Sequence, residues 1–239
     1  GYIPPKQYQT LGQPYSAYVD YLAQRGYVVF KIDLRGHGDS EGEAQGGYYT
    51  SNYVVDTLNA YAALETSGFV DPKKIGMWGH SMAGNTLLRA FAVKPSIKAV
   101  SIWAGAGFTY TDLATYGIRD ASYQPVRPTN TETVGAPRPR VTNQVRALYG
   151  DPRDGNPFWK LVAASNYLSD LKGAIQLNHA VDDDVVSIEY SRNLNTLLDA
   201  TAVIHEFNEF PSGGHNISGQ NFNSAMDKTI TFFDTYFKK

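Results

Sequence analysis

The sequence predicts an α/β protein built on a mostly parallel sheet with helices on its faces. Short apolar stretches of strand length alternate with amphipathic stretches of helix length along most of the 239 residues. A strand, a helix and a further strand form the repeating unit of a parallel sheet. With 42% hydrophobic and 18% charged residues, the chain is long enough for one domain with a substantial core. We therefore treat residues 1–239 as a single domain.

Five strands and five helices account for most of this pattern. The predicted strands are runs rich in aliphatic and aromatic residues, and they cover 27–34, 74–78, 98–104, 173–177 and 202–207. The predicted helices repeat apolar residues every three or four positions, and they cover 15–25, 52–65, 82–93, 187–198 and 221–237. Gly26 follows the first helix at the position where glycine commonly ends one.

A long insertion separates the third predicted strand from the fourth. Residues 106–168 are rich in Pro, Thr, Tyr and Arg, and they carry a helix-like pattern only near 156–165. Insertions of this length in a compact α/β domain usually act as lids or binding loops. We therefore predict a lid-like insertion, with a surface excursion that has no role in substrate binding as the alternative.

Composition excludes several classes of function. Cysteine is absent, which excludes disulfides, thiolate catalysis and cysteine-ligated metals. We expect no metal and no cofactor. The net charge of −2 gives no basis for binding nucleic acid. No apolar run approaches the roughly 20 residues of a membrane-spanning helix. The 17 Tyr and the many Thr, Asn and Ser slightly favour a secreted or periplasmic protein.

Ser81 is the predicted nucleophile, in the segment GHSMAG at 79–84. A short apolar strand precedes this segment and a helix pattern follows it, which is the context of a nucleophile elbow. The tight turn needs small residues two positions either side of the serine, and Gly79 and Ala83 meet this need. The turn lifts the hydroxyl above the carboxyl ends of the strands and directs the Met82 N–H toward the same point.

His215 is the predicted general base. A serine hydroxyl is a weak nucleophile unless a base accepts its proton. Of the five histidines, His215 alone lies in a glycine-rich loop after the last predicted strand, from which a side chain can reach the elbow. The others are assigned to turns, to the elbow itself, or to strands and their edges; they are His37, His80, His179 and His205.

Asp182 is the predicted acid behind the histidine. A carboxylate fixes the tautomer of the imidazole and stabilises the imidazolium that forms. Residues 182–184 are three consecutive aspartates beyond the fourth predicted strand, and Asp182 is the nearest to the strand end. Asp183 and Asp184 are expected to face water or to cap the following helix. A cation site made of the three aspartates is the competing interpretation.

In these residues the chain resembles the prolyl-oligopeptidase and dienelactone-hydrolase branch of the α/β-hydrolases. The chain order Ser, Asp, His agrees with that fold. The resemblance implies an α/β-hydrolase fold, and it supports Asp182 as the acid because the Asp of D-x-x-V carries that role in the branch. Ala83 stands where G-x-S-x-G usually ends in glycine. The matching segments span nearly the whole chain: DLRGHGDSEG at 33–42, GHSMAG at 79–84, YGDPRDGNPFWKLVAASNYLSDLKG at 149–173, D-x-x-V at 182–185 and GGH at 213–215.

The resemblance also implies an oxyanion hole and one more strand. Its donors would be the Met82 N–H and a loop N–H that corresponds to Tyr2 in this sequence. The strand before that loop, between 27–34 and 74–78 in the sheet, has no counterpart in residues 1–239. Its absence would leave two neighbours with unpaired ladders, at a cost of about 1–3 kcal/mol per buried group. We expect an upstream segment of the same protein to complete the sheet, so that residues 1–239 are the C-terminal part of a longer protein.

The predicted function is a carboxylesterase that acts through an acyl-serine intermediate on a small ester. Trp103, Phe108 and Tyr110 follow the third strand and are the predicted pocket residues, with core packing as the alternative. A prolyl-oligopeptidase-type serine peptidase acting on short peptides is the second hypothesis. Such enzymes usually carry a β-propeller, for which residues 1–239 offer no sequence. A non-catalytic binding module with this fold is the third hypothesis.

Overall fold

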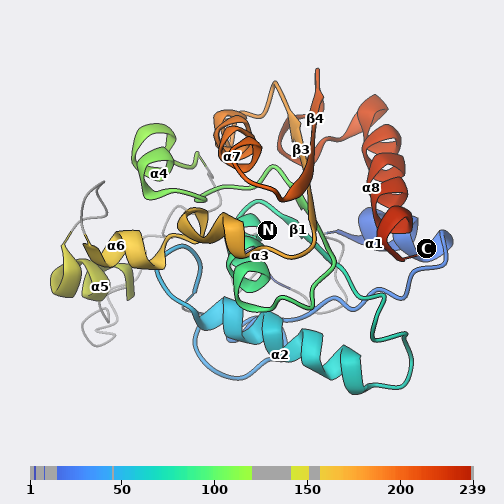
Figure 1. Cartoon of the computed structure of the whole chain (residues 1–239), viewed down its shortest axis with the longest axis horizontal. Coiled ribbons are helices and arrows are strands. Elements are labelled where there is room, and N and C mark those ends of the chain that lie inside the picture. The colour runs from blue at the N-terminus through green and yellow to red at the C-terminus, as the bar shows by residue number, and fades with distance from the viewer. Residues whose placement is uncertain are drawn as a thin grey trace, which may run out of the picture.

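The computed structural model describes residues 3, 8, 15–44, 46–119, 141–150 and 157–237. Within these ranges four parallel strands form one sheet in chain order, and helices cover both of its faces (Figure 1). The α/β class and the parallel sheet are confirmed. The strands are β1 (Met77–His80), β2 (Ala99–Trp103), β3 (Ala174–Ala180) and β4 (Ile204–Phe210). The helices are α1 (Ser16–Gln24), α2 (Asn52–Thr66), α3 (Ala83–Val93), α4 (Tyr110–Tyr116), α5 (Val141–Tyr149), α6 (Pro157–Val162), α7 (Glu189–Asp199) and α8 (Phe222–Phe237).

The two central strands are buried on both faces. Every residue of β2 and β3 is buried, as expected of parallel strands that lie between two helical layers. Residues of α2, α3 and α7 share one apolar cluster with one face of the sheet, and Phe91 and Leu194 lie fully buried in it. Residues of α1 and α8 form a second cluster on the opposite face. This arrangement places the carboxyl ends of all four strands at one edge of the molecule.

Residues 27–34 do not form the predicted strand. In the described part of the chain they pair with no strand, and Val28 and Phe30 are 66% and 51% exposed. β1 pairs with β2 along one edge and with no described strand along the other. A strand needs a neighbour to complete its ladder of hydrogen bonds, and here the described chain supplies none.

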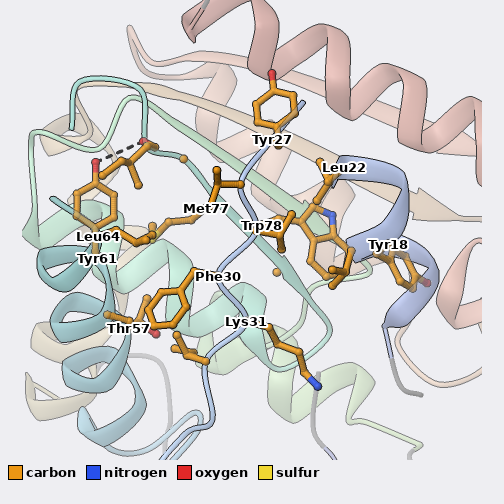
Figure 2. A pocket seen from close by; sticks show the side chains of 18 of the residues that line it. Tyr18, Leu22, Tyr27, Phe30, Lys31, Thr57, Tyr61, Leu64, Met77 and Trp78 are labelled. Carbon is orange, nitrogen blue, oxygen red and sulfur yellow. Dashed lines mark hydrogen bonds between the residues drawn. The ribbon is translucent and has the colours of Figure 1, made fainter. Parts of the chain in front are cut away.

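A groove of about 630 Å³ follows the free edge of β1. Residues 27–32 and Leu34 line it together with β1, α1 and α2 (Figure 2). Met77 and Trp78 reach it from β1, and Tyr18 and Tyr61 from the two helices. The expectation that an upstream segment completes the sheet is not tested by these residues and stays a prediction.

The insertion contains three short helices in its described part, α4, α5 and α6. Residues 120–140 and 151–156 lie outside the described ranges, so the lid-like role of the insertion stays a prediction. No helix among the described residues has both the length and the apolar character needed to cross a membrane.

Candidate active site

Ser81 occupies a tight turn between β1 and α3. Its φ angle is 58°, a left-handed conformation that non-glycine residues rarely adopt. The Ser81 N–H donates to the Trp103 carbonyl at 2.9 Å, and the Ser81 carbonyl accepts from the Gly84 N–H at 2.9 Å. A Cβ at Gly79 would lie 2.5 Å from Leu87 Cδ1 and 3.0 Å from Ala83 Cβ, so a larger residue there would require the start of α3 to shift or Leu87 to repack. The turn therefore has the strand–turn–helix geometry that the sequence predicts for a nucleophile elbow.

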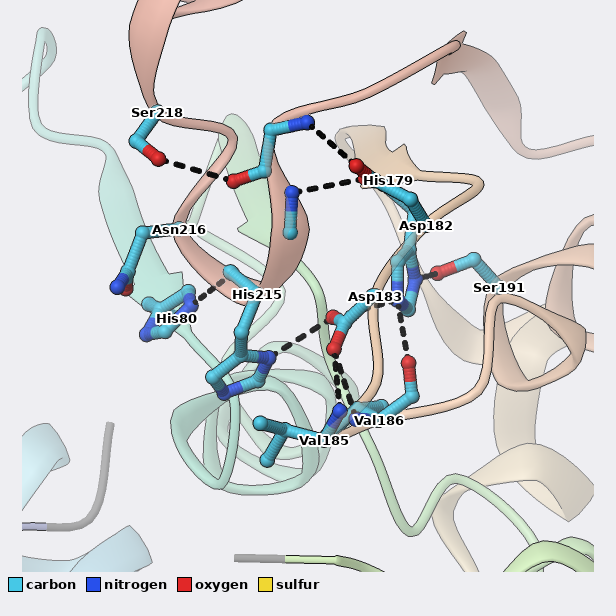
Figure 3. Close-up of polar contacts among 12 residues, drawn as sticks. His80, His179, Asp182, Asp183, Val185, Val186, Ser191, His215, Asn216 and Ser218 are labelled. Carbon is cyan, nitrogen blue, oxygen red and sulfur yellow. Dashed lines mark hydrogen bonds and ion pairs between the residues drawn. The ribbon is translucent and has the colours of Figure 1, made fainter.

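The structure pairs His215 with Asp183 and not with the predicted Asp182. His215 Nδ1–H donates to Asp183 Oδ2 at 2.8 Å (Figure 3). This bond commits Nδ1 to carrying a proton, which leaves a lone pair on Nε2 to accept one. Asp183 is not solvated, because its side chain is fully buried, and it does not cap α7, whose N-cap residue is Ile188.

Asp182 instead binds the main chain of the His215 loop. Its Oδ1 accepts from the Gly214 N–H at 2.8 Å and its Oδ2 from the Gly213 N–H at 3.2 Å. The aspartates thus point to different partners, which argues against the competing cation site. Among the described residues, no group of three His, Asp or Glu side chains is placed to hold a metal ion.

The Asp183 carboxylate is surrounded by N–H donors. Oδ2 also accepts from His179 Nε2–H at 3.1 Å, and Oδ1 accepts from the Val185 and Val186 N–H groups at 2.9 Å each. Burial alone would raise the pKa of Asp183, but the hydrogen bonds from His179, His215 and Val186 outweigh it and hold the pKa below its ordinary value. The site therefore keeps a charged carboxylate behind His215.

The sequence did not identify Asp183 as the partner of His215. Strand β3 continues to Ala180, three residues beyond its predicted end, so proximity to that end did not identify the right aspartate. No signal in the sequence separates the two aspartates. Asp183 makes an Asx turn by accepting the Val185 and Val186 N–H groups, but this turn is seen only in the structure. The supporting role of His179, buried on β3, had no signal in the sequence either.

The described contacts bring His215 to the elbow but not into a hydrogen bond with Ser81. The ring centroids of His215 and His80, the residue before Ser81, are 4.4 Å apart. No hydrogen bond joins Ser81 to the His215 ring within the described ranges. Contacts of this kind are often long in unliganded enzymes and tighten when substrate binds. Met82 lies at the start of α3, where N–H groups have no partner inside the helix. Tyr2, the other predicted oxyanion donor, lies outside the described residues.

The three predicted pocket residues lie in different environments: two are in the core and one lines a cavity. Trp103 is fully buried, and its Nε1–H donates to Thr229 Oγ1 of α8 at 3.1 Å. Phe108 is 1% exposed in the cluster under α3. Both are core residues, so the alternative of core packing holds for them. Tyr110 lines a cavity of about 510 Å³ between α4, α6 and α7, with its ring 4.8 Å from that of Trp159.

The lowered pKa of Asp183 predicts a specific dependence of stability on pH. A carboxyl whose folded pKa lies below its unfolded value of about 3.9 stabilises the fold above that value, and this contribution is lost as the pH falls toward the folded pKa. The difference in unfolding temperature between wild type and Asp183→Asn should therefore be largest near pH 6 and should shrink below about pH 4. Thermal scans across this range measure it. A difference that stays constant down to pH 3 would contradict the prediction.

The chain is similar to several known proteins. A polyketide transferase, claH, of Penicillium crustosum is 34% identical over 73 residues, which are 30% of this chain and 24% of that protein. The chain thus spans about a quarter of the length of this curated relative. Three solved structures share the fold at under 20% identity.

The first is Est1E from Butyrivibrio proteoclasticus with ferulic acid bound (17% identity, 97% of this chain and 86% of that chain, TM-score 0.67). The second is acetyl xylan esterase 1 from Thermoanaerobacterium sp. JW/SL YS485 (16%, 96% and 72%, 0.61). The third is dipeptidyl peptidase 4 from Porphyromonas gingivalis (19%, 93% and 28%, 0.62). The model of the prolyl oligopeptidase family matches residues 14–239, and the chain therefore belongs to that family and has the α/β-hydrolase fold.

Proposed function

We propose that this chain is the catalytic domain of a serine hydrolase that cleaves carboxylic esters. The observation that carries the proposal is the Asp183–His215 pair beside the turn that presents Ser81. Asp183 holds the proton on Nδ1 of His215, so Nε2 is the nitrogen that can accept the serine proton. The other parts are a strained serine and the N–H of Met82 next to it in sequence.

In the proposed reaction, Ser81 Oγ attacks the ester carbonyl carbon while His215 Nε2 takes the serine proton. The oxyanion that forms is stabilised by the Met82 N–H, a contribution of about 2.7–4 kcal/mol for one such donor. The tetrahedral intermediate then expels the alcohol, which leaves with the proton from His215. Water, deprotonated by the same imidazole, attacks the acyl-serine and releases the carboxylic acid. Asp183 stays ionised throughout and stabilises the imidazolium in both steps.

Two of the structural relatives support an ester as substrate. They are the acetyl xylan esterase, which matches 96% of this chain, and Est1E with ferulic acid bound, which matches 97%. A serine peptidase is the second candidate, and the family match over residues 14–239 is the observation in its favour.

Paired substrates separate the two candidates. We expect p-nitrophenyl acetate and methyl ferulate to be hydrolysed with a kcat/KM at least about 10²-fold above that of alanyl-prolyl and acetyl-alanyl p-nitroanilides, which is about 2.7 kcal/mol of differential transition-state binding. Steady-state kinetics at pH 7.5 measure the ratio. Faster cleavage of the anilides would establish the peptidase instead.

A covalent probe tests the third hypothesis, the non-catalytic module. A fluorophosphonate should label the folded wild-type chain at Ser81, as read by mass spectrometry of the labelled peptide. Folded protein that takes up no label and turns over none of the four substrates would be a binding module, and the proposed function would be withdrawn.

A further inference from the structure

The loop that carries His215 needs to be held from outside. It comprises residues 213–217, with a single 3-10 turn at Gly214–Asn216. Gly213 and Gly214 have φ angles of 132° and 58°, which side-chain-bearing residues rarely adopt. Glycines in such conformations lose much conformational entropy when they are fixed, so contacts must offset that loss. The Asp182 carboxylate binds the N–H groups on one side of this loop.

His80 binds the loop from the elbow side. Its Nε2 lies 2.7 Å from the His215 carbonyl, and because a carbonyl only accepts, Nε2 carries the proton. Its Nδ1 therefore accepts from the Tyr15 hydroxyl at 2.8 Å. His80 is 2% exposed, and burial lowers the pKa of its ring well below the ordinary value. The ring thus keeps this one arrangement of donor and acceptor.

Tyr18 binds the next carbonyl of the same loop. Its hydroxyl donates to the Asn216 carbonyl at 2.8 Å. The ring of this tyrosine packs against other aromatic rings, with centroid distances of 4.9 Å to Trp78, 5.5 Å to Trp103 and 5.1 Å to Phe222. Two consecutive carbonyls of the loop are therefore bound by side chains from β1 and α1. We name the bonds from His80 and Tyr18 the carbonyl clamp.

We propose that His80 and Tyr18 are positioning residues that hold the main chain of His215 in the place from which its imidazole serves Ser81. This inference rests on the function proposed above. His80 precedes Ser81 in the chain, so the residue next to the nucleophile binds the backbone of the base (Figure 3). Asp183 orients the His215 ring, and the carbonyl clamp locates its main chain. A displacement of about 1 Å in such a group can lower the rate by roughly 10²-fold.

Four substitutions test the carbonyl clamp. Tyr18→Phe removes one donor while keeping the ring, and it should lower kcat roughly 5- to 30-fold with KM within about twofold. His80→Leu should lower kcat about 10²-fold. His80→Gln should regain part of that loss, because its amide N–H can still donate to the His215 carbonyl. Tyr21→Phe is the matched control: this tyrosine also lies on α1, but its hydroxyl donates to Asp227 of α8. Its kcat should stay within about twofold of wild type.

Rates are measured on p-nitrophenyl acetate per titrated active site, with unfolding temperature recorded for each variant. A fall in unfolding temperature with unchanged kcat would show a purely structural role and overturn the proposal. A second readout does not need turnover. The His215 Nδ1–H proton should broaden or vanish in the NMR spectrum of His80→Leu and persist in Tyr21→Phe. If wild type shows no Ser81-dependent turnover, the proposed function fails, and this proton alone decides the clamp: an unchanged signal in His80→Leu rejects it.

Discussion

Ser81→Ala should reduce ester hydrolysis by about 10⁴- to 10⁶-fold while the protein stays folded. The substitution removes the attacking oxygen and no hydrogen bond of the fold, because the Ser81 hydroxyl is bonded to none of the described residues. The remaining rate should come from the Met82 N–H and from substrate binding alone. Steady-state turnover of p-nitrophenyl acetate and circular dichroism measure activity and fold together.

Ser67→Ala is the matched control for this experiment. Ser67 ends α2, where its hydroxyl donates to the Leu64 carbonyl, and it takes no part in the site. Its variant should keep wild-type kcat. The double variant Ser81→Ala/His215→Ala should be no slower than Ser81→Ala by more than a few-fold, because both residues act in one step. Additive losses would contradict the assigned pairing of nucleophile and base.

Asp183→Asn should lower kcat about 10⁴-fold with little change in KM. An Asn side chain can offer its N–H₂ to His215 Nδ1, which would shift the ring proton to Nε2 and leave no lone pair facing the serine. His179 would also lose the charged acceptor that it now shares with His215. The kcat of the variant on p-nitrophenyl acetate, measured per folded molecule, tests the prediction.

Asp182→Asn is the control for Asp183→Asn, because it removes a neighbouring carboxylate that does not contact the His215 ring. Among the described residues, the Asp182 carboxylate accepts from the N–H groups of Gly213 and Gly214, and an amide oxygen can keep one of these bonds. Its kcat should therefore fall by roughly tenfold or less. The reverse ranking, with Asp182→Asn the slower enzyme, would identify Asp182 as the acid and reject Asp183.

Most of the fold follows from periodicity in the sequence. The boundaries of α2, α3, α7 and α8 agree with prediction within two residues, because each presents a regular apolar face to a buried sheet. The segment 27–34 shows the limit of such reasoning. Its composition is that of a buried strand, but strand formation also needs a partner, and no described strand pairs with it. The local pattern indicates that a segment favours the strand conformation, but it does not show which strand, if any, will pair with it.

The candidate site was predictable to the extent that its chemistry lies in local motifs. Ser81 and His215 could be found because an elbow and a glycine loop have recognisable sequence contexts. Choosing between Asp182 and Asp183 depended on where β3 ends, and strand ends are set by pairing with β4 rather than by the strand's own sequence. His80 and Tyr18 act through main-chain carbonyls more than 130 positions away, which no spacing in the sequence reveals.

At position 81 the requirements of stability and of catalysis differ, because the left-handed backbone favours glycine and the reaction needs a hydroxyl. A residue other than glycine in this conformation carries a strain of about 1–3 kcal/mol. Glycine would remove that strain, so selection for thermal robustness alone would steer position 81 away from serine. If only the scaffold were under selection, the single substitution Ser81→Gly would give a more stable protein without activity. A hydroxyl at such a place is what selection for turnover would be expected to preserve.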